Sequence, residues 1–163
     1  MNLEVKRILV PIDYSENALL AKDFALAQAK VFGAQVNLLH VVDNTTYESY
    51  LQKGFMGELP VYLPIGQAPH GSPMEEKIEE FMNKAKAELD SYAGPHGAEV
   101  VTTLRQGNVV QEVLNEAKEY GADMIIMCTH GWTGIKHLMM GSTTERIVRM
   151  SEIPVLTIRG KHG

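Results

Sequence analysis

The chain has 163 residues, 45% hydrophobic and 21% charged, which suits one ordinary domain with a single sizeable core. Its 15 Lys and Arg against 20 Asp and Glu give a formal net charge of −5 without a basic cluster longer than a pair, which argues against a nucleic-acid footprint. No apolar run approaches the roughly 20 residues that cross a bilayer, and no signal-peptide pattern opens the sequence. We therefore expect one cytoplasmic domain over residues 1–163, with no nucleic-acid or membrane partner.

Five apolar runs alternate with helical patterns, and this alternation predicts a parallel α/β sheet. The first predicted strand covers residues 7–12. A helix follows over residues 15–32, with Ser15 as its N-cap and Gly33 as its terminator. The second predicted strand covers residues 35–42.

A stretch rich in Gly, Pro and aromatic residues follows over residues 43–73, without usable periodicity. Insertions of this length are usually lids, partner contacts or disorder. The aromatic side chains Tyr47, Tyr50, Phe55 and Tyr62 argue against plain disorder. We interpret the stretch as a long loop insertion that forms an interaction surface.

The second half of the chain repeats the alternation. A charged helix is predicted over residues 74–92, a strand over residues 99–104, and a helix over residues 108–120 with Asn108 as its cap and Gly121 as its end. A fourth strand over residues 123–127, a helix over residues 142–150 and a strand over residues 154–158 complete the pattern. Pro154 suits the first position of an edge strand.

The loop between the fourth strand and the last helix is the most informative segment. It runs from Thr129 to Gly141, longer than the roughly 2–6 residues typical of such connections. Ser142 followed by Glu145 has the spacing of a capping box, and a helix N-terminus favours an anion such as phosphate. No Walker lysine or Gly-x-Gly-x-x-Gly is present, so a phosphate would bind mainly through backbone and hydroxyl groups. Such caps and loops also occur in α/β proteins without a ligand, and both interpretations stay open.

The ends of three predicted strands carry polar or loop residues, at residues 11–13, 41–43 and 127–131. In open α/β sheets these ends meet at the ligand crevice, so we expect them to converge. Asp13 is equally compatible with a helix cap and a ligand contact. For Asp43 we favour a role as the start of the long loop, and for His40 a role as a packing histidine.

Cys128 is the single cysteine, which excludes an intramolecular disulfide and agrees with a reducing compartment. We expect a buried, unreactive thiol. The alternative, a nucleophile paired with His130, would need an orienting third group that the sequence does not supply.

Several segments together resemble a known family. They are KRILVPIDYS at residues 6–15, LLHVV at residues 38–42, residues 125–131, Gly141-Ser142 and IPVL at residues 153–156. In these segments the chain resembles the universal stress protein family along nearly its full length. The resemblance implies a single open five-stranded parallel sheet with helices on both faces, in a flavodoxin-like or adenine nucleotide alpha hydrolase-like arrangement. It also implies a homodimer, and an ATP-binding branch beside a branch that binds no nucleotide.

The ATP-binding branch is marked by Gly, two residues, Gly, nine residues, Gly, and then Ser or Thr. This chain has Cys128, Gly131, Gly141 and Ser142 at these positions, so the first glycine is replaced. Cysteine is small, and a side chain directed away from the ligand would leave the path open. We therefore expect the ATP-binding branch.

The resemblance implies adenosine contacts from Asp13 and Val41, an adenine pocket shaped by Pro11, and phosphate donors in the loop and last helix. It implies ATP, or AMP or ADP, as the ligand. With bound ATP, Mg²⁺ or Mn²⁺ held by the phosphates is expected on chemical grounds, and no carboxylate near Gly141 is an obvious protein ligand for it. The full set of implied contacts is Pro11, Asp13, Val41, Met127, Cys128, His130, Gly131, Gly141, Ser142, Thr143 and Thr144.

Two other functions compete with a nucleotide-binding regulator. The first is a dimeric interaction module without nucleotide, which Cys128 in place of glycine and the aromatic stretch over residues 43–73 suggest. The strand over residues 154–158 would supply the edge that pairs with a second copy. The second is an enzyme, for which only His130 and Lys136 are candidate groups, so that any ATP hydrolysis should be slow.

Overall fold

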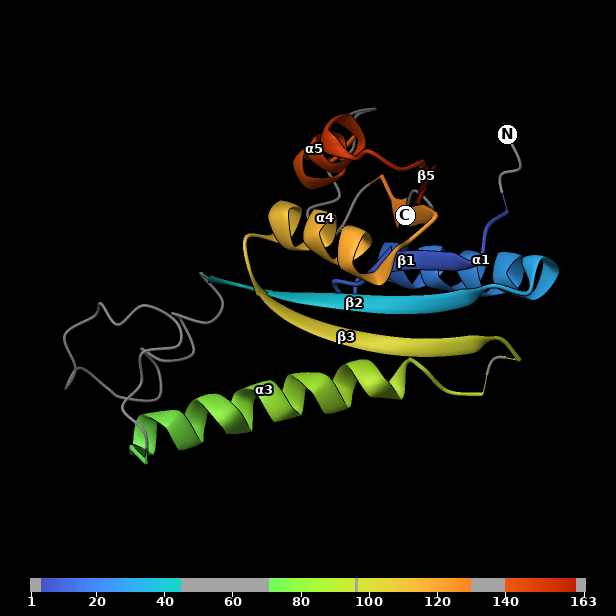
Figure 1. Cartoon of the computed structure of the whole chain (residues 1–163). Coiled ribbons are helices and arrows are strands. Elements are labelled where there is room, and N and C mark those ends of the chain that lie inside the picture. The colour runs from blue at the N-terminus through green and yellow to red at the C-terminus, as the bar shows by residue number, and fades with distance from the viewer. Residues whose placement is uncertain (1–3, 45–70, 96, 130–139, 161–163) are drawn as a thin grey trace.

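The structure is a computed structural model that describes residues 4–44, 71–95, 97–129 and 140–160, and every structural statement below refers to these residues. Parallel strands form one open sheet in the order β3-β2-β1-β4-β5 (Figure 1). The predicted fold class, a five-stranded parallel sheet with helices on both faces, is confirmed. The strands are β1 (Arg7–Pro11), β2 (Gln35–Asp43), β3 (Glu99–Gly107), β4 (Met124–Cys128) and β5 (Val155–Ile158), and the helices are α1 (Glu16–Phe32), α3 (Pro73–Ser91), α4 (Val109–Tyr120) and α5 (Ser142–Met150).

The core lies in two layers, one on each face of the sheet. Successive side chains of a strand point to opposite faces, so Ile8 and Val10 of β1 pack on one side and Leu9 on the other. The first side is covered by α1 and α3, and the second by α4 and α5. In Figure 1, α4 and α5 lie above the sheet and α3 lies below it. The continuous apolar runs of the sequence therefore reflect strands that are buried on both faces.

The predicted helix ends are confirmed where the cap is local. Ser15 Oγ accepts a hydrogen bond from the Ala18 N–H at 3.1 Å, and Asn108 caps α4 in the same way through the N–H of Gln111. Gly33 and Gly121 end α1 and α4 with φ of 65° and 68°, a left-handed backbone that glycine adopts without steric cost.

The predicted capping box at Ser142 is wrong. The N-cap of α5 is Gly141, whose carbonyl accepts the Glu145 N–H at 2.9 Å, and within the described ranges no side chain caps this helix. Ser142 is the first helical residue, so its backbone has already turned into the helix and its hydroxyl does not occupy the capping position.

The β3 strand is longer than predicted, since it continues past Leu104 and pairs Gly107 with Asp43. The reason lies in α4, because Arg105 of β3 forms ion pairs with Glu112, Glu116 and Glu119 on successive turns of that helix. Burial alone would lower the pKa of Arg105, but the hydrogen bonds that its guanidinium donates to these carboxylates outweigh burial and raise that pKa.

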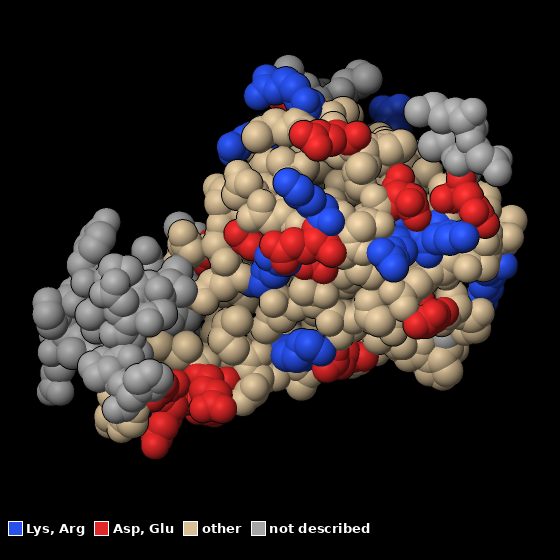
Figure 2. Space-filling model, in the orientation of Figure 1, with Lys and Arg blue, Asp and Glu red and all other residues tan. Residues whose placement is uncertain are grey.

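The surface carries mixed charge. On the face in Figure 2, the side chains of Lys and Arg are interspersed with those of Asp and Glu. Among the described helices, none is both long enough and apolar enough to cross a bilayer.

Candidate functional site

A cavity of about 790 Å³ opens where β1, β2 and β4 end. Its volume lies within the roughly 300–1,000 Å³ typical of small-molecule sites. The chain leaves β1 toward α1 on one face of the sheet and leaves β4 toward α5 on the other, so the cavity lies where the strand order reverses. Ligands of open parallel sheets bind at this position.

The structure brings nine of the eleven residues named from the sequence to this one cavity. His130 and Gly131 fall outside the described residues, as do Lys136 and residues 45–70 of the long insertion. Whether the nine bind a ligand stays a prediction. They are Pro11, Asp13, Val41, Met127, Cys128, Gly141, Ser142, Thr143 and Thr144.

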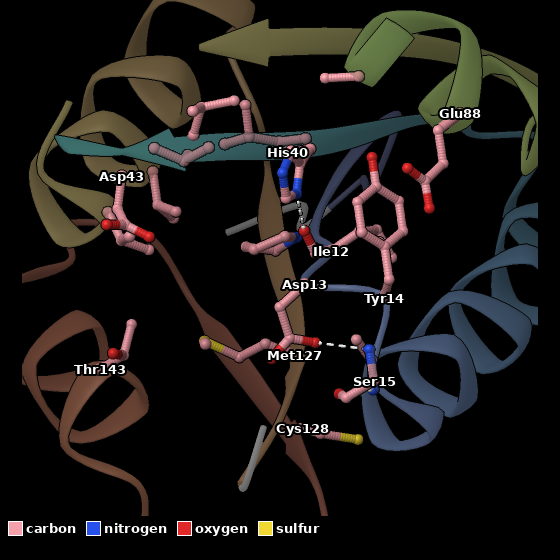
Figure 3. Close-up of a pocket in the computed structure, with 18 of the residues that line it drawn as sticks. Ile12, Asp13, Tyr14, Ser15, His40, Asp43, Glu88, Met127, Cys128 and Thr143 are labelled. Atoms are coloured by element: carbon pink, nitrogen blue, oxygen red, sulfur yellow. Dashed lines mark hydrogen bonds between the residues drawn. The ribbon is translucent and has the colours of Figure 1, made fainter. Parts of the chain in front are cut away.

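The N-terminus of α1 forms one wall of the cavity, and side chains next to it accept hydrogen bonds from its backbone N–H groups. Asp13 Oδ1 accepts the Ser15 N–H at 3.0 Å, and Ser15 in turn caps the helix (Figure 3). The carboxylate of Asp13 therefore stabilises the start of α1, and it also lines the cavity.

Tyr14 is a cavity residue that the sequence analysis did not single out. Its φ of 62° is positive, which is a true outlier for a bulky side chain. The ring packs against His40 and Tyr92, with centroid distances of 4.5 and 5.4 Å, and its buried hydroxyl has no hydrogen-bond partner among the described residues. Burial, followed by the negative charge of Glu88, raises the pKa of this hydroxyl. No sequence signal marks a left-handed backbone at a tyrosine.

His40 lies between Tyr14 and the end of β1. One ring nitrogen, Nδ1, lies 2.7 Å from the Ile12 carbonyl oxygen, so the ring links β2 to the chain after β1 (Figure 3). This contact agrees with the packing role expected for His40, although the ring also lines the cavity. Tyr14, His40 and Tyr92 together form an aromatic column that joins α1, β2 and the end of α3.

Cys128 has the buried thiol that the sequence predicts. Its Sγ donates to the Asn17 carbonyl oxygen of α1 at 2.6 Å and is directed toward that helix in Figure 3. Burial raises the pKa of the thiol, which keeps it protonated and unreactive. Among the described residues, Tyr14 is the one non-glycine with a positive φ, so the backbone of Cys128 does not need glycine.

The N-terminus of α5 forms the opposite wall and is held by bonds to the end of β4. The Gly141 N–H donates to the Thr129 carbonyl at 2.7 Å, and Thr144 Oγ1 donates to the Cys128 carbonyl at 3.0 Å. The hydroxyl of the buried Thr144 is therefore engaged within the protein. Ser142 and Thr143 at the cavity surface are the hydroxyl residues of this turn that remain for a ligand.

A third wall comes from α3, which the sequence analysis did not assign to the site. Glu80, Lys84 and Glu88 recur every fourth residue, the spacing of one helix face, with Phe81 and Ala85 beside them. The spacing of these residues in the sequence predicts that they share one face of a helix, but it does not predict which part of the protein that face packs against.

The lining has an excess of negative charge. Among the described lining residues, there are four carboxylates, on Asp13, Asp43, Glu80 and Glu88, and one amine, on Lys84. The N-terminus of α5 carries the opposite sign, because the aligned peptide dipoles of a helix amount to about half a positive charge at that end. An anionic group is thus favoured at α5, and polar or cationic groups are favoured near the carboxylates.

A parallel α/β sheet with a cavity at its switch point defines a broad class of small-molecule-binding folds. Comparison with known proteins shows which family of this class the chain belongs to. The family model described as "Universal stress protein family" matches residues 4–60 and 61–159. The chain belongs to the universal stress protein family.

Individual relatives agree with this assignment. The chain is 30% identical to Universal stress protein MJ0577 of Methanocaldococcus jannaschii, with all of both chains covered. It is similar to the solved structure of MJ0577 with a TM-score of 0.71 and 26% identity, over 98% of this chain and 99% of that one. The fold is also shared with the universal stress protein from Archaeoglobus fulgidus in complex with dAMP, at a TM-score of 0.58 and 20% identity, over 95% and 98% of the two chains.

Proposed function

We propose that the cavity binds an adenine nucleotide, ATP or its di- or monophosphate, and that occupancy makes the protein a regulatory sensor in a stress response. The observation that carries this proposal is the N-terminus of α5, which no side chain of the described residues caps and which opens into a cavity of about 790 Å³. A helix N-terminus in this position attracts phosphate through both its N–H groups and its dipole. The A. fulgidus relative in complex with dAMP supports an adenine nucleotide as the ligand class.

The lining residues divide between the two parts of such a ligand. Gly141, Ser142 and Thr143 would receive the phosphates at the start of α5. The adenosine part would lie against Pro11, Asp13, Val41 and Met127 at the strand ends. Cys128 takes the place of the first glycine of the ATP-binding pattern, and its thiol bonds to α1 instead of extending toward α5.

Because the cavity lining is negative, the affinity for ATP should depend on a divalent cation. The four carboxylates of the described lining oppose a highly charged polyphosphate, and a divalent cation on the phosphates would offset the charge of the phosphates. We expect ATP to bind more tightly with Mg²⁺ or Mn²⁺ than in the presence of a chelator. Titration calorimetry under both conditions measures this difference, and a higher affinity for metal-free ATP would contradict it.

The main test combines ATP titration with thermal unfolding. Mg-ATP should stabilise the protein by about 2.7 kcal/mol at a hundredfold excess over Kd. Gly141→Leu should abolish this effect by filling the phosphate position. Its backbone, at φ −58° and ψ 146°, accepts any residue, so the variant should remain folded.

The matched control is Gln111→Leu, which places the same leucine side chain in the first turn of α4, at an exposed position outside the cavity. It should bind ATP like the parent. Absence of both heat and thermal shift for the parent protein would refute nucleotide binding. Mass spectrometry of the small molecules that co-purify with the native protein would identify the preferred nucleotide.

A second candidate function, a dimeric interaction module without nucleotide, is favoured by the edge strand β5. In the described part of the chain β5 pairs only with β4, so its outer edge is open. Val148 and Met150 of α5 and Leu156 of β5 are exposed at 41%, 47% and 37%. Apolar side chains on and near an open edge favour two-fold pairing with a second copy.

We therefore propose a homodimer through residues 154–158, whether or not nucleotide binds. Sedimentation at micromolar concentration should give about twice the 18.1 kDa mass of one chain. Leu156→Lys should shift the protein toward monomer, because a charge at the edge opposes strand pairing. Gln111→Lys is the control, and a monomeric parent protein would refute the dimer.

A further inference from the structure

The outer face of α1 carries an apolar seam that the site does not use. Phe24, Ala27 and Val31 follow one another at spacings of three and four residues, and Phe24 and Val31 are exposed at 40% and 75%. The opposite face of the helix is buried in the core. The buried residues there are Ala18, Ala21, Ala25, Leu26 and Ala29.

Spacings of three and four are those of the seam in a helix pair, where apolar side chains of one helix fit between those of another. A surface helix of a single folded chain normally presents polar residues on its outer face. Val31 is the most exposed large apolar residue described, so its position on this seam calls for a partner.

The charges beside the seam indicate what that partner is. Asp23 and Lys30 lie seven residues apart, so they occupy the same side of the seam, one on each of two successive heptads. Both are exposed, and Asp23 forms an ion pair with the neighbouring Lys22 at 3.3 Å. In an antiparallel pair of identical helices, residues at this flanking position face each other.

We propose that α1 pairs antiparallel with α1 of a second copy of this chain. Asp23 of each copy then faces Lys30 of the other, and the two-fold axis passes near Ala27. A parallel pair would bring Asp23 nearest to Gln28 and would form no such charge pair. The self-complementary charges therefore select both the partner and the direction.

The seam covers only about two helical turns, so the buried area is below the roughly 1,200 Å² of a standard interface. The contact should be weak and dependent on concentration. It is separate from the β5 edge, because α1 packs on the face of the sheet over β1 and β4. If both contacts form, dimers joined through β5 associate further through α1.

A charge-swap experiment tests the pairing in the full chain. Asp23→Lys and Lys30→Asp should each weaken the α1-mediated step by about tenfold, because two opposite-charge pairs become like-charge pairs. The double variant should restore it. Sedimentation equilibrium up to millimolar concentration measures all four proteins, and a double variant no better than the single ones would overturn the proposal.

A cross-linking experiment tests the geometry independently of the β5 edge. Ala27→Cys places an exposed thiol near the proposed axis, while native Cys128 is buried. Mild oxidation should give a covalent dimer in high yield. Lys118→Cys, on the exposed side of α4, should give little. Equal yields from both variants, or a covalent dimer from neither, would refute the α1 contact, whatever the outcome for β5 or for nucleotide.

Discussion

Two helix N-termini open onto the same cavity, and the protein treats them differently. At α1, Ser15 caps the helix, and Asp13 accepts the backbone N–H of Ser15. These groups of the chain itself pair with backbone N–H donors and place a negative charge at the positive end of the helix dipole. At α5, the N-cap is Gly141, and no side chain in the part of the chain that the structure describes caps the first turn. Instead, Thr144 and Gly141 bond to backbone carbonyls at the end of β4.

The difference indicates how the two ends are used. A capped N-terminus next to a carboxylate is a poor site for another anion, whereas an uncapped one positioned by tertiary bonds retains its attraction for phosphate. The same cavity therefore has one end that serves stability and one end that is available to a ligand. Variants at the two helices can separate these roles.

The largest effect is expected at the tertiary bond that holds α5. Thr144→Val keeps the size of the buried side chain but leaves the Cys128 carbonyl without its hydroxyl donor, at a cost of about 1–3 kcal/mol in the free energy of unfolding. Thr143→Val is the control, because this exposed neighbour should change stability by no more than about 0.5 kcal/mol. Chemical denaturation measures both, and equal losses would show that α5 is not positioned by Thr144.

An intermediate effect is expected at the caps. Ser15→Ala removes the hydroxyl that caps α1 and should cost about 1 kcal/mol. Ser142→Ala should cost no more than about 0.5 kcal/mol, because Ser142 does not cap α5. The two serines begin similar sequence patterns, so matched thermal unfolding curves compare them directly. A loss at Ser142 as large as that at Ser15 would restore the capping box and remove the contrast between the helices.

The smallest effect on stability concerns Cys128, which touches both helices through its thiol and its carbonyl. Burial raises the pKa of the thiol, so the folded protein should resist alkylation at pH 8 and react only in denaturant. The contribution of the thiol to stability is complete below the unfolded pKa of about 8.5 and is lost as pH rises through the higher folded value. Rapid modification of the folded protein would show that the thiol faces the cavity instead of α1.

Features with a local cause could be predicted from the sequence. Ser15, Gly33, Asn108 and Gly121 mark helix ends because each acts on backbone groups within a few residues of itself. The buried strands were also predictable, since each apolar run is bounded by polar or turn residues. The convergence of the strand ends at the cavity follows from parallel order alone.

Features with a distant cause could not be predicted. The extension of β3 through Arg105 depends on glutamates that α4 brings beside it, and the contribution of Lys84 and Glu88 to the cavity depends on where α3 packs. Asp123 was assigned to a strand, but its carboxylate accepts the backbone N–H groups of Lys6 and Arg7, each at 2.8 Å. Tyr14 adopts a left-handed backbone because packing on His40 and Tyr92 overrides its local preference.

The aromatic column of Tyr14, His40 and Tyr92 affects the conformational entropy that the protein would lose on binding a ligand. Since it ties α1, β2 and α3 together, that wall is already arranged before binding, and little conformational entropy remains to be lost there. We expect most of the conformational entropy lost on ligand binding to come from the α5 wall of the cavity. Amide hydrogen exchange with and without Mg-ATP would then slow mainly in α5, and only slightly around Tyr14.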